Sequence, residues 1–180
     1  MPKSNKTKYA ILGLLASGPR SGYDIKKTVD HSIGFFWNEN YGHLYPILNR
    51  MERGGLLSMT QSGRASGPVK KVYAITARGK KELLAWLRTP VDDQPIRNEL
   101  LLRIFFGRRA GAGDVKNMVR AEKKKNQELV SIFNEIKSGI ERGNSSDAPY
   151  WAITLDFGIR KSEMIIQWCD ETLKALGRMK

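Results

Sequence analysis

One stretch of the sequence combines groups that can bind nucleic acid with the apolar spacing of a helix. Between Asn40 and Leu57, apolar residues recur at i, i+3, i+4 and i+7, and these are Leu44, Ile47, Leu48 and Met51. The other face carries aromatic, amide and guanidinium groups that can reach bases or phosphates, from Tyr41, His43, Tyr45, Asn49 and Arg50. Because the apolar face must pack on a core, the polar face points outward. We interpret this stretch as the recognition helix of a DNA-binding domain; an ordinary amphipathic surface helix is the alternative.

Local signals indicate where this helix begins and ends. Pro46 is tolerated only in the first turn, where no hydrogen bond is lost. The helix is therefore predicted to begin near Gly42–Tyr45, with its N-terminus open to a phosphate. The glycines after Arg53 are predicted to end it. Arg50 could instead pair with Glu52 or cap the helix end. The candidate DNA contacts of the stretch are Asn40, Tyr41, Gly42, His43, Tyr45, Pro46, Asn49 and Arg50.

Positive charge is concentrated in the same half of the chain. Residues 1–88 hold 15 Lys and Arg against 5 Asp and Glu, a formal charge of +10, whereas residues 89–180 hold 16 against 13, or +3. This imbalance is typical of a domain that binds a polyanion, although a solvated basic surface without a partner would look the same. Further candidate phosphate contacts are Lys26, Lys27, Arg64, Lys70 and Lys71, of which Arg64 could alternatively enter the minor groove.

Two helices are predicted ahead of the recognition stretch. The first covers Lys8–Ser17 and is apolar on more than one side, so it can serve both the domain core and a partner surface. The second begins after Ser21, a good N-cap with Asp24 three residues on. The connection His31–Glu39 contains Phe35-Phe36-Trp37, which we expect to pack between the helices rather than to stack on bases.

A hairpin and another helix are predicted after the recognition stretch. Residues 56–61 and 69–75 have the composition and alternation of strands, and residues 62–68 make a basic, glycine-bearing loop between them. A hairpin directly after a recognition helix is the wing of a winged helix. Thr76 is expected to cap a helix over Ala77–Arg88, which returns an apolar face to the core through Leu83, Leu84, Trp86 and Leu87.

The second half of the chain is predicted to be helical. Residues 89–96 read as a hinge, followed by a buried helix over Arg97–Gly107. Two long helices are expected, one capped by Asp114 and ending near Arg142, the other over Tyr150–Leu176, with the charge run at 122–125 as a solvated face. The apolar stripes exceed what this segment can bury in itself, so we expect an isologous homodimer.

The expected fold class is mainly α (α+β), a winged helix-turn-helix DNA-binding domain with an all-helical dimerisation domain. The predicted boundaries are residues 1–88 for the first domain, 89–96 for the hinge and 97–180 for the second.

Several motifs resemble the phenolic acid decarboxylase regulator (PadR) family of transcription factors. They are YAILGLL at residues 9–15, SGYDI at 21–25, Trp37, GHLYPILNRME at 42–52, GLL at 55–57 and KVYAITARG at 71–79. Residues 97–107, RNELLLRIFFG, resemble the start of the longer C-terminal domain in the branch that includes virulence-gene activators. The resemblance implies a homodimeric repressor whose two recognition helices lie about one DNA turn apart on a palindromic site.

A small-molecule sensor acting through the same fold is a second hypothesis. Five aromatic residues near the predicted domain junction could bind a small aromatic effector, and relatives in the family respond to phenolic or flat apolar compounds. The same residues could simply fill the core and the dimer interface. They are Phe36, Trp37, Trp86, Trp151 and Trp168.

An enzyme is the least favoured class. The sequence has no glycine-rich phosphate loop or metal-ligand cluster, and its only histidines are His31 and His43. Asp92, Asp93 and Asp114 could in principle hold a metal, but linker and capping roles account for them. We therefore expect no catalytic residue, no metal and no cofactor.

The predicted setting is the cytoplasm. Cys169 is the only cysteine, so no internal disulfide can form. No segment approaches the roughly 18 apolar residues of a membrane span. We expect double-stranded DNA as the partner, and no membrane.

Overall fold

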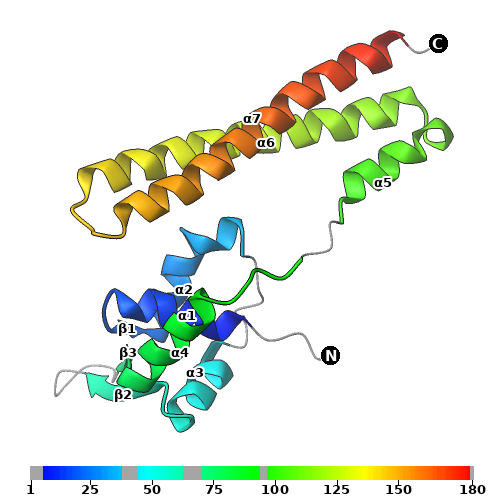
Figure 1. The fold of residues 1–180 in the computed structure, drawn as a ribbon. Coiled ribbons are helices and arrows are strands. Elements are labelled where there is room, and N and C mark those ends of the chain that lie inside the picture. Colours follow the sequence, from blue (N-terminus) through cyan, green and yellow to red (C-terminus); the bar gives the residue numbers. More distant parts are fainter. Residues whose placement is uncertain (1–5, 38–43, 63–69, 94–96, 179–180) are drawn as a thin grey trace. The chain divides into compact units, whose positions relative to one another are not determined.

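The computed structural model describes residues 6–37, 44–62, 70–93 and 97–178 (Figure 1). The chain divides into two compact units, residues 1–93 and residues 94–180, and each has its own apolar cluster. The first unit combines helices with a small sheet. In the second unit, all the described elements are helices.

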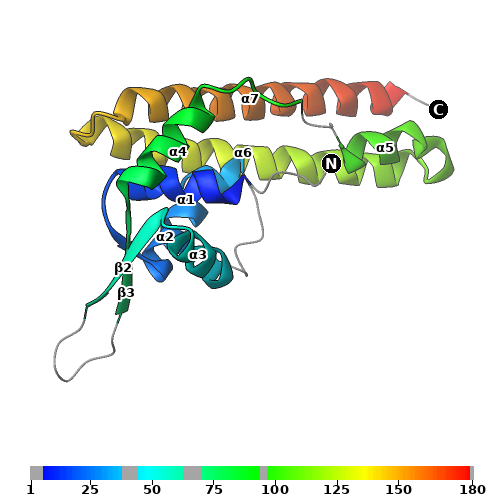
Figure 2. The same cartoon turned by 60° about the horizontal axis from the view of Figure 1, so that its bottom comes forward.

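The sheet of the first unit has three antiparallel strands in the order β1-β3-β2. The elements are α1 (Thr7–Ala16), β1 (Arg20–Ser21), α2 (Gly22–Asp30), the 3-10 helix η1 (Ile33–Phe35), α3 (Leu44–Arg53), β2 (Leu57–Ser62), β3 (Lys70–Ile75) and α4 (Ala77–Leu87). Arg20 and Met59 lie opposite Tyr73 from the two sides of β3. The strands β2 and β3 confirm the predicted hairpin, and Figure 2 shows it extending away from the helices of its unit. The strand β1 was not predicted.

Helices α1, α2 and α3 pack with the sheet around one core. Its buried residues are Ile11, Leu12, Leu15, Ile25, Val29, Leu44, Leu48, Met51, Leu57 and Tyr73. Three of the four residues in the predicted α3 stripe belong to this core, and the fourth, Ile47, packs against it half-buried. The prediction for the apolar face of α3 is therefore confirmed.

Two predicted helix caps are confirmed. The Ser21 hydroxyl oxygen accepts a hydrogen bond from the Asp24 backbone N–H at 3.2 Å, and an Asp24 carboxylate oxygen accepts from the Ser21 N–H at 3.4 Å. Thr76 Oγ1 accepts from the Gly79 N–H at 3.0 Å and donates to the Gly55 carbonyl at 2.7 Å. Thr76 therefore also joins the start of α4 to the turn after α3.

Gly79 is required where α4 crosses this turn. An ideal Cβ at position 79 would lie 2.3 Å from the Leu56 carbonyl oxygen, a backbone atom held by the Thr76 contacts. We expect Gly79→Ala to lower the free energy of unfolding by about 1–3 kcal/mol because the core must shift to admit the methyl group. Denaturant unfolding of the full chain measures it. Gly13→Ala is the control: nothing lies within 4 Å of its Cβ position in α1, so stability should rise by about 0.5–1 kcal/mol. Equal effects of the two changes would contradict the prediction.

The expected aromatic packing in the connection after α2 is wrong for Phe35 and Phe36 and holds only for Trp37. Within the first unit Phe35 and Phe36 are exposed, and only Trp37 is half-buried. The 3-10 helix η1 turns Ile33 toward the core, which leaves the following phenylalanines on the outside. The predicted apolar face of α4 toward the core is wrong for two of its four residues. Leu83 packs on the core and Trp86 stacks on Tyr9, so the adjacent Leu84 and Leu87 point away and are exposed.

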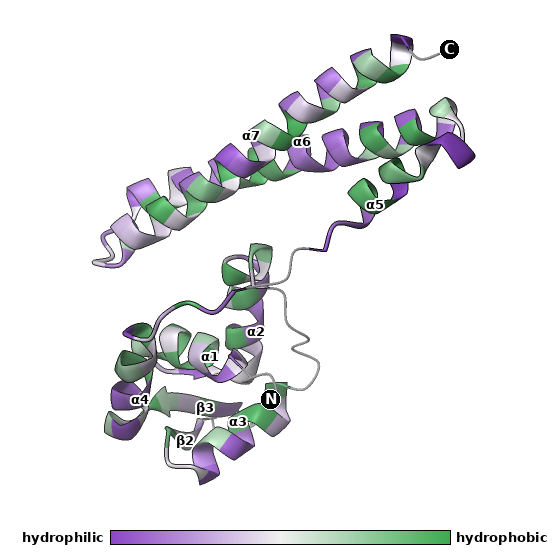
Figure 3. Ribbon diagram, turned by 45° about the vertical axis from the view of Figure 1, so that its right-hand side comes forward, coloured by the Kyte–Doolittle hydropathy of each residue, from purple (hydrophilic) through white to green (hydrophobic). Residues whose placement is uncertain are grey.

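The second unit is a long helical pair with a short helix ahead of it. Its elements are α5 (Glu99–Phe105), the 3-10 helix η3 (Gly107–Arg109), α6 (Ala112–Arg142) and α7 (Ala148–Arg178). Helices α6 and α7 lie side by side along their length, and Figure 3 shows hydrophobic and hydrophilic residues alternating along both. Val115, Val119, Cys169 and Leu176 form the buried cluster between them, with Trp168 against it.

Three predictions for the second unit are wrong. Helix α5 is not buried within its unit, because Leu101, Leu102, Phe105 and Phe106 are exposed; only Ile104 packs on the cluster. Asp114 does not cap α6. The cap residue is Gly111, whose φ of +88° suits glycine, and Asp114 lies in the first turn, where its charge favours the helix dipole. The charge run at 122–125 is only partly solvated, because Lys123 forms an ion pair with Asp170 of α7 and is half-buried.

Candidate DNA-binding surface

The polar face of α3 is exposed where the sequence predicted it. Tyr45 is 56% exposed, and Pro46, Asn49 and Arg50 are exposed too. Since α3 starts at Leu44, Pro46 lies in the first turn as predicted. The candidates Asn40, Tyr41, Gly42, His43 and Arg64 lie outside the described residues. The described part of α3 thus presents an aromatic ring, an amide and a guanidinium group on the side opposite its buried stripe.

Arg50 is available for a partner. Among the described residues it forms no ion pair, so the alternative pairing with Glu52 is not present. The helix end is instead contacted by Arg53, whose Nε donates to the Asn49 carbonyl at 3.3 Å. The capping role considered for Arg50 therefore falls to Arg53.

Four exposed lysines accompany α3 in the same unit. Lys26 and Lys27 lie on α2, and Lys70 and Lys71 begin β3. None of the four takes part in an ion pair within the described ranges. The Ser21 hydroxyl, helped by the charges of Lys70 and Arg20, holds the pKa of Asp24 below its ordinary value. Ser21 pairs with Val72 in the sheet, so Lys70, two residues earlier at the loop end of β3, lies near the start of α2.

The five aromatic candidates do not form one cluster. Trp86 stacks on Tyr9 with ring centroids 4.5 Å apart and an interplanar angle of 5°. Trp37 is half-buried, and its indole N–H has no hydrogen-bond partner in the described part of the chain. Trp151 and Trp168 lie 17 positions apart on α7, about 25 Å along the helix axis. One small molecule cannot contact both of these tryptophans within one chain.

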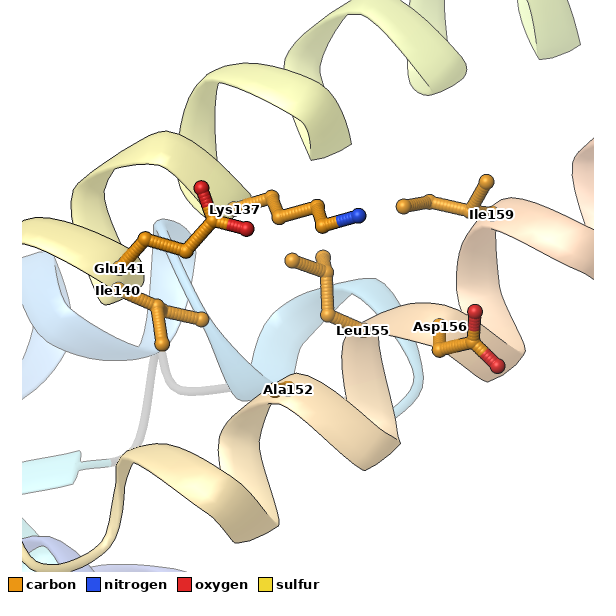
Figure 4. A pocket seen from close by; sticks show the side chains of 7 residues that line it. All are labelled: Lys137, Ile140, Glu141, Ala152, Leu155, Asp156 and Ile159. Carbon is orange, nitrogen blue, oxygen red and sulfur yellow. The ribbon is translucent and has the colours of Figure 1, made fainter.

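A pocket does lie between α6 and α7, but none of these aromatics lines it (Figure 4). Its lining residues are Lys137, Ile140 and Glu141 from α6, and Ala152, Leu155, Asp156 and Ile159 from α7. The floor is apolar, while one ammonium group and two carboxylates stand around it. Because Asp156 is ion-paired with Arg160 at 2.6 Å, the charges around the pocket nearly balance and favour neither an anion nor a cation.

Metal binding, thiol chemistry and membrane spanning can each be compared with the described residues. They contain no group of three or more His, Cys, Asp or Glu side chains able to hold a metal ion. Burial raises the pKa of the Cys169 thiol, which leaves little of the reactive thiolate. No helix in these ranges is long and apolar enough to cross a membrane.

A three-stranded sheet carried by three helices, with a hairpin directly after an exposed polar helix, defines a winged helix-turn-helix domain. The model of the transcriptional regulator PadR-like family matches residues 11–85, and the model of the virulence activator alpha C-terminal domain matches residues 96–177. The chain belongs to the PadR-like family of transcriptional regulators. This confirms the resemblance and the fold class, and a family of transcriptional regulators is not a family of enzymes.

Relatives match over nearly the whole chain. A probable transcriptional regulator of Mycobacterium tuberculosis is 31% identical over 93% of this chain and 96% of its own. The negative transcriptional regulator PadR of Bacillus subtilis is 26% identical over 95% and 97%. The structure of B. subtilis PadR with operator DNA has a TM-score of 0.82 at 24% identity, covering 94% of this chain and 98% of that one. The structure of the same protein with p-coumaric acid has a TM-score of 0.76 at 22% identity, covering 99% of each.

Proposed function

We propose that this chain is a homodimeric, sequence-specific DNA-binding regulator that represses transcription from a palindromic operator. The observation that carries the proposal is the exposed face of α3, with Tyr45, Asn49 and Arg50 opposite the stripe that packs on the core. Four lysines without ion pairs in the described chain lie on neighbouring elements of the same unit. The relatives support the proposal, because one is a negative regulator and its structure has been solved with operator DNA.

In this proposal α3 enters the major groove with its N-terminal part. Asn40, Tyr41, His43, Tyr45 and Asn49 contact base edges and nearby phosphates, and Gly42 and Pro46 belong to the same contact surface. The phosphate contacts, which set the register of the protein on DNA without reading sequence, come from Lys26, Lys27, Arg50, Arg64, Lys70 and Lys71. Residues 1–88 would be the DNA-binding domain, residues 89–96 the hinge and residues 97–180 the dimerisation domain.

An unpartnered apolar stripe on α7 supports the homodimer. Tyr150, Ile153, Phe157 and Met164 are spaced by three, four and seven residues, so they share one face of the helix, and all four are exposed. The face toward α6 uses other residues, including Ser162 and Cys169. A stripe of this regularity would bury itself against a second copy, and two copies would present two recognition helices to one palindromic site.

Binding to the DNA upstream of the chain's own gene tests the function. We expect a complex that survives excess random DNA and weakens steeply as salt rises. Random DNA that competes at equal affinity would contradict sequence-specific binding.

Asn49→Ala tests the reading face of α3 within that complex. The loss of a bidentate amide contact to adenine should reduce discrimination at one position by about 1–3 kcal/mol. The fold should not change, because the Arg53 contact uses the Asn49 backbone carbonyl. The measurement is a competition series over single-base operator variants. An unchanged base preference would contradict the placement of Asn49.

A second candidate function is release of DNA by a small aromatic effector. It is favoured by the partial exposure of Trp151 and Phe36 and by the p-coumaric acid complex of B. subtilis PadR. Titration with a panel of phenolic compounds should quench tryptophan fluorescence saturably and lower operator affinity. The absence of saturable quenching across the panel would count against it.

A further inference from the structure

Gly22, the first residue of α2, lies directly under the ring of Tyr45. An ideal Cβ at position 22 would stand 2.8 Å from Tyr45 Cε1, 3.2 Å from Cζ and 3.3 Å from the phenol oxygen. Real Cβ atoms essentially never make contacts as short as the first of these. The outer edge of the ring therefore occupies space that exists only because residue 22 has no side chain.

The backbone at Gly22 is held from two directions. Ser21 pairs with Val72 in the β1–β3 ladder, and the capping box between Ser21 and Asp24 closes over the first turn of α2. Gly22 itself is buried. If a side chain were added here, the helix start could not easily retreat from it.

The Tyr45 side chain, by contrast, can move. It is 56% exposed, and the atoms that meet position 22 are at the far end of the ring. A rotation about its side-chain bonds would relieve the clash without disturbing the buried stripe of α3. Displacement of the Tyr45 ring is therefore the change of lowest free-energy cost that accommodates a methyl group at position 22.

We propose that Gly22 is a positioning residue for DNA binding: it provides the space that fixes the Tyr45 ring against the start of α2. The inference rests on the proposed function, in which Tyr45 contacts DNA. It assigns to α2 a role apart from its lysines, since α2 sets the orientation of a side chain on the recognition helix. Gly22 touches no DNA in this assignment and acts through Tyr45.

A double-mutant cycle tests the inference on the full-length protein. Gly22→Ala should weaken operator binding about tenfold, the cost of one misplaced hydrogen bond to a charged group. Tyr45→Ala should weaken it at least as much. In the Tyr45→Ala background, Gly22→Ala should cost nothing further, because the ring it displaces is gone.

Stability measurements separate positioning from misfolding. In the Tyr45→Ala background Gly22→Ala should leave the melting temperature unchanged or raise it, because alanine favours a helix over glycine. Gly113→Ala is the matched control, since it also adds a methyl group in the first turn of a helix and meets nothing within 4 Å. It should leave operator affinity unchanged.

A DNA-free measurement tests the contact itself, and the binding measurements then distinguish failure of the inference from failure of the proposed function. Wild-type protein should show a nuclear Overhauser effect between the Gly22 Hα and Tyr45 Hε protons. If Tyr45→Ala weakens binding while Gly22→Ala is silent, or if Gly22→Ala weakens binding equally in both backgrounds, the inference is overturned and the proposed function stands. If the wild type makes no specific complex, the proposed function falls together with the role of Gly22 in DNA binding.

Discussion

Replacing Ile153 and Phe157 by aspartate should convert the protein to a monomer and reduce operator affinity by two to four orders of magnitude. Both side chains lie on the exposed stripe of α7, at 70% and 67% exposure. Burial against a second copy would contribute about 1.5–3 kcal/mol for each. Aspartate removes that gain and places four carboxylates in the interface of every dimer. A monomer then binds one half-site without the effective concentration that the linked second half-site supplies, which is worth roughly 10²–10⁴ in affinity.

Light scattering after size-exclusion chromatography measures the mass, and operator binding is measured on the same sample. The fold should survive, because neither side chain belongs to the buried cluster of its unit. Val91→Asp is a control that adds charge at an apolar residue that is 95% exposed and lies off the stripe, and it should change neither mass nor affinity. A doubly substituted protein that stays dimeric at micromolar concentration would show that the stripe is not the dimer interface.

Local patterns in the sequence predicted the elements that carry the candidate site. The stripe of α3 repeats every three to four residues, and the caps at Ser21 and Thr76 require only short-range chemistry, so each could be inferred from a few neighbouring residues. From Pro46, the start of α3 could be predicted to within one helical turn. By contrast, β1 has only two residues, too few to show alternation, and it exists because β3 offers it an edge.

The predictions that proved wrong depend on non-local contacts. Lys123 meets Asp170, 47 residues further along the chain, so a run of charges around Lys123 looks solvated from sequence alone. The apolar residues of α5 predict that the helix is buried, but the sequence does not show whether the same chain or a second copy packs on it. The contact between Gly22 and Tyr45 also joins two helices that are distant in the chain. Locally, the sequence shows only a glycine between Ser21 and Tyr23, which does not indicate what packs on it.

Replacing Lys26, Lys27, Lys70 and Lys71 together by alanine should weaken DNA binding at least a thousandfold at physiological salt, equally for operator and random DNA. All four are exposed and free of ion pairs within the described residues, so their charges are available to phosphates. A dimer would lose up to eight phosphate contacts. Each contact contributes about 0.9 to the slope of log affinity against log salt, so the slope should flatten by up to about 7.

The slope separates phosphate contacts from loss of fold, because an unfolded protein loses affinity at every salt concentration, whereas lost contacts flatten the dependence. Lys80, Lys81, Lys124 and Lys125 changed together to alanine remove the same charge from exposed positions on α4 and α6. If only total charge matters, this control should weaken binding as much as the test variant does. If specific contacts matter, it should keep the wild-type slope. A test variant with an unchanged slope would remove these lysines from the DNA-binding surface, and the positive charge of residues 1–88 would then be a general property of the unit rather than a footprint of DNA.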